Sequence, residues 1–248
     1  IKKVSDNFKK NSILVVDHYL LGRSWQKSVK MIFSKIVVID DLLYSKHFCD
    51  VIIDPNIRET YNKNNHSIEY NNILTPIYSG KDYLIIRPEF DDVKAQIKKS
   101  IHIKKDLIDI LIMFGGGNRK NSIDDILSAL QELNQKINIH LIANQYHESD
   151  INIKQLRDSG KNIIIYNFTD EVHKIMGKCD IAFGALGATT WERYYLGIPS
   201  IVHVENNNQD RFLNYLKSKN IVFDLGNNIN FEKIKKGMEY FQSNNENL

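Results

Sequence analysis

Three polar side chains follow the first apolar run of the sequence, and they belong to types that handle protons. Asp17, His18 and Tyr19 come directly after residues 13–16, Ile-Leu-Val-Val, which are typical of a buried parallel strand. The trio is therefore expected at the carboxyl edge of a sheet, where a tyrosine hydroxyl can donate to a sugar, phosphate or water oxygen. Asp17 and His18 could orient Tyr19 or an attacking water. The alternative is a buried hydrogen-bond network that only holds the strand end.

A second candidate is a run of three glycines between an apolar stretch and an amphipathic one. Gly115, Gly116 and Gly117, followed by Asn118, stand where a strand should give way to a helix. Glycine lets the backbone approach a diphosphate, and a helix N-terminus offers free N–H groups and the positive end of its dipole. The run is neither a G-x-G-x-x-G fingerprint nor a P-loop. It predicts a nucleotide-binding turn, and the alternative is a tight turn with a structural role alone.

The sequence Gly-Ala-Thr-Thr-Trp-Glu, which begins at Gly187, repeats this arrangement more specifically. Thr189 or Thr190 can cap the helix that follows the turn. Glu192 would then face the same opening, where a carboxylate can accept both hydroxyls of a ribose; alternatively, it only complements the helix dipole. The set expected to bind a ligand at this edge is Gly187, Ala188, Thr189, Glu192, Asn208 and Gln209.

The order of apolar and amphipathic stretches predicts an α/β fold with parallel strands. In the first part, strands are expected at 12–17, 35–40 and 49–54, a helix at 24–34 and a loop at 56–72. Asp40 and Asp41 end the second strand, and at least one of them is expected to be structural. In the second part, six strand–helix units make a Rossmann-like domain. We therefore predict the remainder of an N-terminal Rossmann-like domain at 1–90, a hinge at 91–106 and a nucleotide-binding Rossmann-like domain at 107–248.

The composition argues against several classes of partner. The net charge is only +3 and the charges are mixed along the chain, so the basic block that binds nucleic acid is missing. No apolar run approaches the roughly 20 residues needed to cross a bilayer. The two cysteines, Cys49 and Cys179, lack metal-ligand spacing, and histidines such as His47 are expected to be solvated or core residues. We expect a cytoplasmic monomer with no cofactor, metal, nucleic acid or membrane partner.

Five motifs, taken in this order, resemble one family. They are VVDHYLLGRSWQ at 15–26, VIDDLLYSKHFCDVIIDPN at 38–56, GKDYLIIRPEF at 80–90, MFGGGN at 113–118, and GATTWERYYLGIPSIV with NNNQ at 187–209. The pattern is similar to the UDP-sugar hydrolases of pseudaminic acid biosynthesis, which release UDP from UDP-2,4-diacetamido-2,4,6-trideoxy-β-L-altropyranose. Related spore-coat and flagellin-modification proteins share it. The glycine-rich loop and the Thr-Trp-Glu helix are shared more widely with GT-B glycosyltransferases.

This resemblance implies a GT-B architecture, with two Rossmann-like domains of which the N-terminal one is incomplete here. It implies that the second domain binds UDP through the turns at Gly115–Gly117 and Gly187–Thr190 and through Glu192, and that Tyr19 lies in the active site. It further implies metal-independent hydrolysis of the C1–O bond with inversion, in a cleft between the domains.

The chain departs from the family in one respect. The family's Gly-x-Gly-His-x-x-Arg turn, whose histidine is expected to activate water, has no match. We therefore expect the sequence to be a piece of a longer protein, and the chain alone to have little or no hydrolase activity. Two alternatives remain open: a GT-B glycosyltransferase that uses a UDP-sugar donor, and an inactive UDP-sugar-binding fragment.

Overall fold

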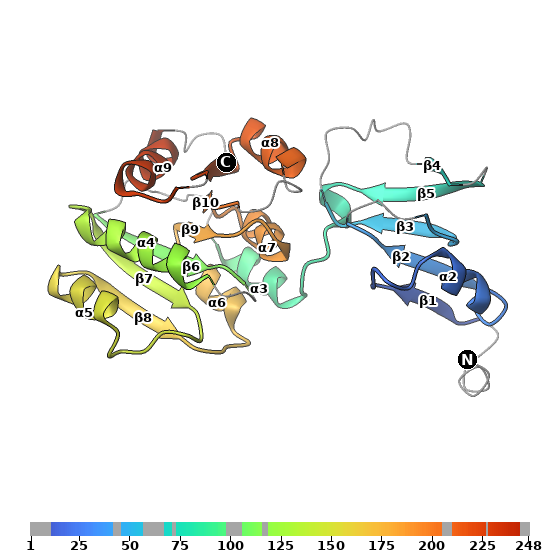
Figure 1. Cartoon of the computed structure of the whole chain (residues 1–248), viewed down its shortest axis with the longest axis horizontal. Coiled ribbons are helices and arrows are strands. Elements are labelled where there is room, and N and C mark those ends of the chain that lie inside the picture. The colour runs from blue at the N-terminus through green and yellow to red at the C-terminus, as the bar shows by residue number, and fades with distance from the viewer. Residues whose placement is uncertain are drawn as a thin grey trace. The chain divides into compact units, whose positions relative to one another are not determined.

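The chain divides into two compact units, Ile1–Ile85 and Ile86–Leu248, here called unit 1 and unit 2 (Figure 1). The structure is a computed structural model that describes residues 11–41, 46–56, 67–70, 73–97, 106–115, 119–204, 210–226 and 228–243. Each unit contains its own β-sheet. The hinge predicted at 91–106 stays a prediction, because residues 98–105 lie outside the described ranges.

Unit 1 is built on a five-stranded sheet with the order β1-β2-β3-β5-β4. Its elements are β1 (Ile13–Val16), α2 (Arg23–Val29), β2 (Lys35–Ile39), β3 (Val51–Asp54), β4 (Ser67–Tyr70), β5 (Ile73–Ser79) and the 3-10 turn η1 (Lys81–Tyr83). The first four strands in the sheet order run parallel, and β4 pairs antiparallel with β5. The three predicted strands are confirmed. The predicted loop at 56–72 is wrong at β4, because pairing with β5 gives this polar stretch a strand ladder that composition alone does not signal.

The two faces of this sheet differ in burial. Val16, Ile36 and Val38 are buried and pack with Val29 of α2. The side chains that point the other way along β1, Ile13 and Val15, are each 58% exposed. Because side chains alternate along a strand, α2 covers one face only of the described strand β1. The helix predicted at 24–34 is shorter than expected and ends at Val29.

Unit 2 is built on a six-stranded parallel sheet with the order β11-β10-β9-β6-β7-β8. The strands are β6 (Leu107–Met113), β7 (Lys136–Ile142), β8 (Asn162–Tyr166), β9 (Ile181–Gly184), β10 (Ser200–Val202) and β11 (Val222–Asp224). The helices are α3 (Glu89–Gln96), α4 (Lys120–Glu132), α5 (Ile151–Asp158), α6 (Val172–Met176), α7 (Ala188–Leu196), α8 (Asp210–Ser218) and α9 (Phe231–Ser243). This is the strand order of a doubly wound nucleotide-binding sheet, and the six predicted strand–helix units are confirmed.

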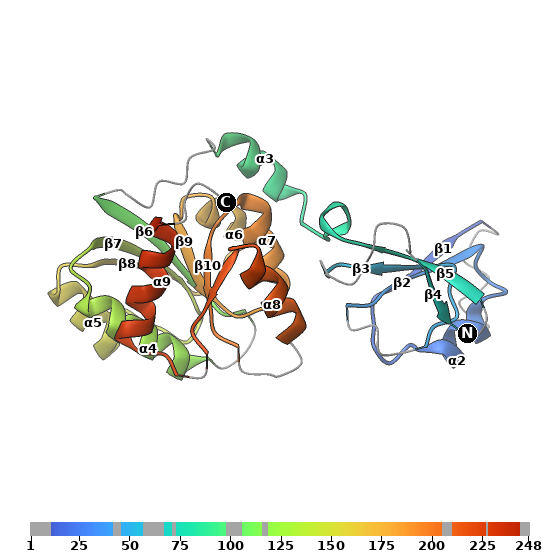
Figure 2. The same ribbon diagram turned by 90° about the horizontal axis from the view of Figure 1, so that it is seen from above.

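Helices cover both faces of this sheet, which explains why its strands are apolar almost throughout. Helices α4, α5 and α9 pack on one face and α3, α6 and α7 on the other (Figure 2). Helix α4 shows how the sequence specifies this packing, because its buried residues recur at helical spacing: Ile123, Ile126, Leu127 and Leu130. Within the described ranges, no helix is both long and apolar enough to cross a membrane.

Candidate functional site

The strand order of unit 2 places the carboxyl ends of β6 and β9 side by side, and each strand is followed by a glycine-rich stretch of sequence. Strands β6 and β9 are parallel neighbours, and the helices that follow them pack on opposite faces of the sheet, α4 on one and α7 on the other. This is the topological switch point of the sheet, outside which open α/β sheets bind their ligands. The turn after β6 and the turn after β9 are therefore the part of unit 2 where a ligand is expected.

The turn after β6 begins with a residue that only glycine suits. Gly115 is exposed and has a φ of 76°, in the left-handed region that residues with a Cβ rarely adopt. The space around it is open, since, its chain neighbours apart, no atom of the described residues lies within 4 Å of the position that a Cβ would take. The other predicted members of this turn, Gly116, Gly117 and Asn118, lie outside the described residues.

The turn after β9 leads directly into α7. Gly187 is the N-cap residue, and Ala188 and Thr189 start the first helical turn, whose N–H groups have no partner within a helix. The prediction that Thr189 or Thr190 is the cap is wrong. Thr190 lies inside the helix, and its Oγ1 accepts a hydrogen bond from the Gly187 N–H at 3.1 Å. Gly187 is exposed, and a Cβ added to it would have no atom of the described residues within 4 Å apart from its chain neighbours.

Glu192 has one carboxylate oxygen occupied and one without a partner. It lies in the second turn of α7 and is only 9% exposed. Arg87 donates from Nε to its Oε1 at 2.9 Å, and the Arg87 guanidinium lies over the Phe90 ring at 5.1 Å. Oε2 is buried, and no described residue is its hydrogen-bond partner. The alternative role of dipole complement is weakened, because that effect fades beyond the first turn.

One further described residue, Phe168, lies at the same edge of the sheet. Phe168 comes two residues after β8 and is 90% exposed, which is unusual for a phenylalanine. Sequence reasoning missed it, and its only signal was an aromatic residue directly after a predicted strand. Asn208 and Gln209, which were predicted to follow β10, lie outside the described residues.

In unit 1, the predicted trio is exposed at the end of β1. Tyr19, which is 66% exposed, donates its hydroxyl to Asp41 Oδ1 at 2.7 Å. This bond, together with partial burial and the nearby carboxylates, raises the pKa of Tyr19 to about 12. Asp17 and His18 are also exposed, so the alternative of a buried network formed by the trio is wrong.

The hydrogen bonds of the trio limit what each group can do. Tyr19 stays protonated at neutral pH, so it can serve as a donor and not as a base. His18 Nδ1 accepts the Leu20 N–H at 3.1 Å, which in the neutral ring places the proton on Nε2. Asp17 differs from both, because a carboxylate side chain offers only hydrogen-bond acceptors.

A buried polar network lies instead at the end of β2. His47 Nε2 contacts Asp40 Oδ2 at 2.7 Å, and both side chains are almost fully buried. Gln26 accepts the Phe48 N–H at 2.6 Å and contacts His47 Nδ1 with its amide nitrogen at 3.0 Å. Since the Gln26 oxygen is fixed by Phe48, its amide donates to Nδ1, and Nε2–H of His47 must donate to Asp40. Asp40 is thus the structural member of the Asp40–Asp41 pair, and His47 is a core histidine as expected.

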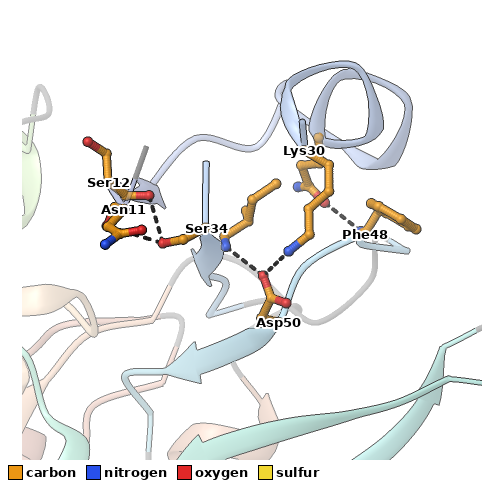
Figure 3. Close-up of polar contacts among 8 residues, drawn as sticks. Asn11, Ser12, Lys30, Ser34, Phe48 and Asp50 are labelled. Atoms are coloured by element: carbon orange, nitrogen blue, oxygen red, sulfur yellow. Dashed lines mark hydrogen bonds and ion pairs between the residues drawn. The ribbon is translucent and has the colours of Figure 1, made fainter. Parts of the chain in front are cut away.

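Beside this network is a cavity of about 150 Å³ that contains none of the predicted catalytic residues. It is lined by Arg23, Lys30, His47, Phe48, Cys49, Asp50 and Thr75. Lys30 pairs with Asp50 at 2.5 Å, and the same carboxylate oxygen accepts the Ile36 N–H at 2.7 Å (Figure 3). Burial raises the pKa of Cys49 to about 12, so its thiol is not a ready nucleophile. The contacts in this cavity serve packing and charge balance.

Among the residues that the structure describes, no group of three or more His, Cys, Asp or Glu side chains is placed to hold a metal ion.

No model of a known protein family matches the chain. The uncharacterised protein MJ1062 of Methanocaldococcus jannaschii is 25% identical over 213 residues, which cover 84% of this chain and 43% of that protein. The spore coat polysaccharide biosynthesis protein SpsG of Bacillus subtilis is 23% identical over 154 residues, or 61% of this chain and 44% of SpsG. The match therefore spans less than half the length of either relative.

Two solved structures resemble the chain over nearly its whole length. MurG of Acinetobacter baumannii has a TM-score of 0.59 at 12% identity and covers 98% of this chain, which in turn covers 65% of MurG. The spinosyn forosaminyltransferase SpnP has a TM-score of 0.54 at 9% identity, with coverages of 95% and 69%. Both are GT-B glycosyltransferases, and at these identities the likeness shows the fold alone. The predicted GT-B fold with Rossmann-like units is thereby confirmed.

Proposed function

We propose that unit 2 binds the UDP moiety of a nucleotide sugar. We further propose that the chain belongs to an enzyme that hydrolyses this nucleotide sugar to the free sugar and UDP. The substrate class is a UDP-linked 2,4-diacetamido-2,4,6-trideoxy sugar, as in pseudaminic acid biosynthesis and flagellin glycosylation. This class rests on the motif resemblance given above. The GT-B fold and the similarity to SpsG, a protein named for polysaccharide biosynthesis, agree with a role in sugar metabolism.

The observation that carries the proposal is the buried carboxylate oxygen Oε2 of Glu192, to which no residue in the described ranges donates a hydrogen bond. A buried acceptor without a donor is costly, by about 1–3 kcal/mol, and native proteins rarely retain one without a reason. A ribose offers two adjacent hydroxyl donors. In the proposed complex, Oε2 of Glu192 accepts one of them, while Arg87 holds Oε1 and fixes the carboxylate orientation.

The diphosphate and the base have matching features at the same edge. The first turn of α7, at Ala188 and Thr189, presents N–H groups and the positive end of the helix dipole to an anion. The open turn at Gly115 lets the backbone approach the same group. The exposed ring of Phe168 offers a stacking surface for the uracil base.

The proposed reaction breaks the C1–O bond of the sugar. A water attacks C1 from the face opposite the diphosphate, the bonding electron pair leaves with the UDP oxygen, and the water loses a proton to a base. Inversion at C1 follows from this single displacement. Unit 1 is proposed to contribute Tyr19 as a hydrogen-bond donor, with His18 and Asp17 beside it. Of these three side chains, Asp17 is the one that serves only as a hydrogen-bond acceptor.

Binding is tested by calorimetry with UDP in the presence of EDTA. The wild type should bind UDP, and Glu192→Gln should weaken binding by roughly 10- to 150-fold, the equivalent of losing about 1.5–3 kcal/mol from a charge-assisted contact. Glu171→Gln is the matched control, because Glu171 is a surface carboxylate paired with Lys174. Unchanged affinity in Glu192→Gln would remove the main support for the site.

The reaction class is tested by release of UDP from such a sugar in ¹⁸O-labelled water. Cleavage of the C1–O bond places the label in the sugar and not in UDP, and the sugar appears first as the inverted anomer. Release of UDP only after a sugar or lipid acceptor is added would favour the glycosyltransferase alternative.

A further inference from the structure

Arg193 is a buried cation that no carboxylate in the described part of the chain neutralises by an ion pair. It follows Glu192 in α7, is 0% exposed, and is the largest fully buried side chain of the described residues. Its Nη2 donates to the Ala185 carbonyl at 2.9 Å and contacts Thr190 Oγ1 at 3.1 Å. Its Nε and Nη1 are buried and have no hydrogen-bond partner among the described residues.

This guanidinium is charged under ordinary conditions. Burial lowers the pKa of Arg193 to about 10, and the neighbouring Glu192 carboxylate acts in the opposite direction. The group therefore remains protonated at neutral pH. A buried charge without a paired counter-charge destabilises the folded protein, and replacing it with an apolar side chain of similar volume is often neutral or stabilising. An arginine with two unused donors thus calls for a reason other than stability.

The position of Arg193 gives that reason. A Cβ at Gly184 would lie 2.5 Å from Nη1 of Arg193 and 2.4 Å from the Met113 carbonyl oxygen, so the guanidinium fills the space that this glycine leaves at the ends of β9 and β6. Through Ala185 and Thr190 it also holds the turn that leads into α7. The charge is therefore placed at the switch point, next to the start of the helix.

We propose that Arg193 is a positioning residue for the anionic part of the ligand. It shapes the turn from Ala185 to Thr190, and its uncompensated positive charge attracts the diphosphate to the first turn of α7. The bound diphosphate then supplies the counter-charge that the free protein lacks. This inference rests on the proposed function, because it assumes that the ligand is a nucleoside diphosphate.

The test compares ligands that share the nucleoside and differ in the number of phosphate groups. Wild type and Arg193→Met are titrated with uridine, UMP and UDP, and their melting temperatures are recorded without ligand. We expect the affinity for uridine to change by less than about twofold, whereas the affinity for UDP falls by about tenfold or more, because the diphosphate is charged and uridine carries no phosphate. We also expect Arg193→Met to melt no lower than the wild type, since methionine leaves no unpaired charge.

A second variant separates the charge of Arg193 from its effect on the shape of the turn, and a third serves as the control. Thr190→Val keeps the guanidinium and its bond to the Ala185 carbonyl but removes its contact with Thr190 Oγ1, so UDP binding should fall less than in Arg193→Met. Arg157→Met is the matched control, because Arg157 forms a surface ion pair with Glu148, and its UDP-to-uridine preference should equal that of the wild type.

These measurements separate failure of the proposed role of Arg193 from failure of the proposed function. If the wild type binds none of the three ligands, the proposed function and this inference fall together. If the wild type binds UDP but Arg193→Met keeps the same UDP-to-uridine preference, only the role of Arg193 is overturned. An Arg193→Met protein that melts lower or does not fold would likewise overturn it, since the side chain would then be required for stability.

Discussion

Polar side chains near the strand ends differ between the two units in whether their hydrogen-bonding atoms have partners. We compare the ends of β1 and β2 in unit 1 with the ends of β6 and β9 in unit 2. In unit 1, Asp40 and His47 are buried and bonded to each other, and Tyr19 is exposed and bonded to Asp41. In unit 2, Glu192 and Arg193 are buried, yet each keeps polar atoms that have no partner in the described part of the chain. Satisfied groups stabilise the fold without a ligand. Unsatisfied groups are retained where a ligand completes them, so the difference points to unit 2 as the binding region.

The largest expected effect tests the packing at the switch point. Gly184→Ala should lower the free energy of unfolding by about 3 kcal/mol, because the new methyl would overlap the Met113 carbonyl oxygen and the Arg193 guanidinium. Gly187→Ala is the control at the next turn, where the space is open and φ is extended at −149°, and it should be nearly neutral. Urea denaturation of both variants measures this. Equal losses would show that Gly184 has no special role in making room for Arg193.

The next effect tests the satisfied network of unit 1. Asp40→Ala should lower the free energy of unfolding by about 2 kcal/mol, because it leaves the buried Nε2–H of His47 without its acceptor. Asp17→Ala, at the end of the neighbouring strand, removes an exposed carboxylate and should change stability little. The comparison is made by thermal and urea unfolding. A larger loss in Asp17→Ala would reverse the assignment of structural and exposed roles.

A smaller effect is expected for the base. Phe168→Ala should weaken UDP binding by about 1.5 kcal/mol, since stacking on an aromatic ring contributes about 1–3 kcal/mol per base. Stability should not fall, because the ring is almost fully exposed. Titration of UDP and of inorganic pyrophosphate checks the assignment. Weaker binding of pyrophosphate as well would mean that Phe168 acts on the turns and not on the base.

The smallest effect on stability is expected for Tyr19→Phe, below about 1 kcal/mol, because the bond to Asp41 is exposed to solvent. The folded pKa of Tyr19 is raised above its ordinary value, so this contribution is complete below pH 10 and is lost as the pH rises toward 12. If Tyr19 assists turnover, the variant should lower kcat and leave the UDP dissociation constant unchanged. If the full-length Tyr19→Phe enzyme keeps the wild-type kcat, Tyr19 does not assist turnover.

The fold was predictable because its signals are local. Apolar runs identified β6 through β11, and helical spacing identified α4. The strand β4 was missed because its polar sequence gains strand structure only by pairing with β5. The length of α2 was overestimated because apolar residues continue past Val29, although Met31 is 95% exposed.

The site was predictable in part, for a similar reason. Glycines after a strand and Glu192 in the following helix can be read from spacing. The pairing of Glu192 with Arg87, which lies 105 positions earlier in the sequence, cannot. Nor does the sequence reveal that Arg193 is buried, because arginine is normally exposed and only the missing Cβ of Gly184 makes room for it.

The central claim is that Oε2 of Glu192 accepts a ribose hydroxyl, and one thermodynamic cycle tests it most directly. Wild type and Glu192→Gln are each titrated with UDP and with its 2′-deoxy and 3′-deoxy forms. The account predicts that at least one deoxy form binds the wild type about tenfold more weakly than UDP, a loss of about 1.4 kcal/mol, and that this loss largely disappears in Glu192→Gln. Equal losses in both proteins would contradict the claim, because the hydroxyl would then be recognised by a group other than Glu192.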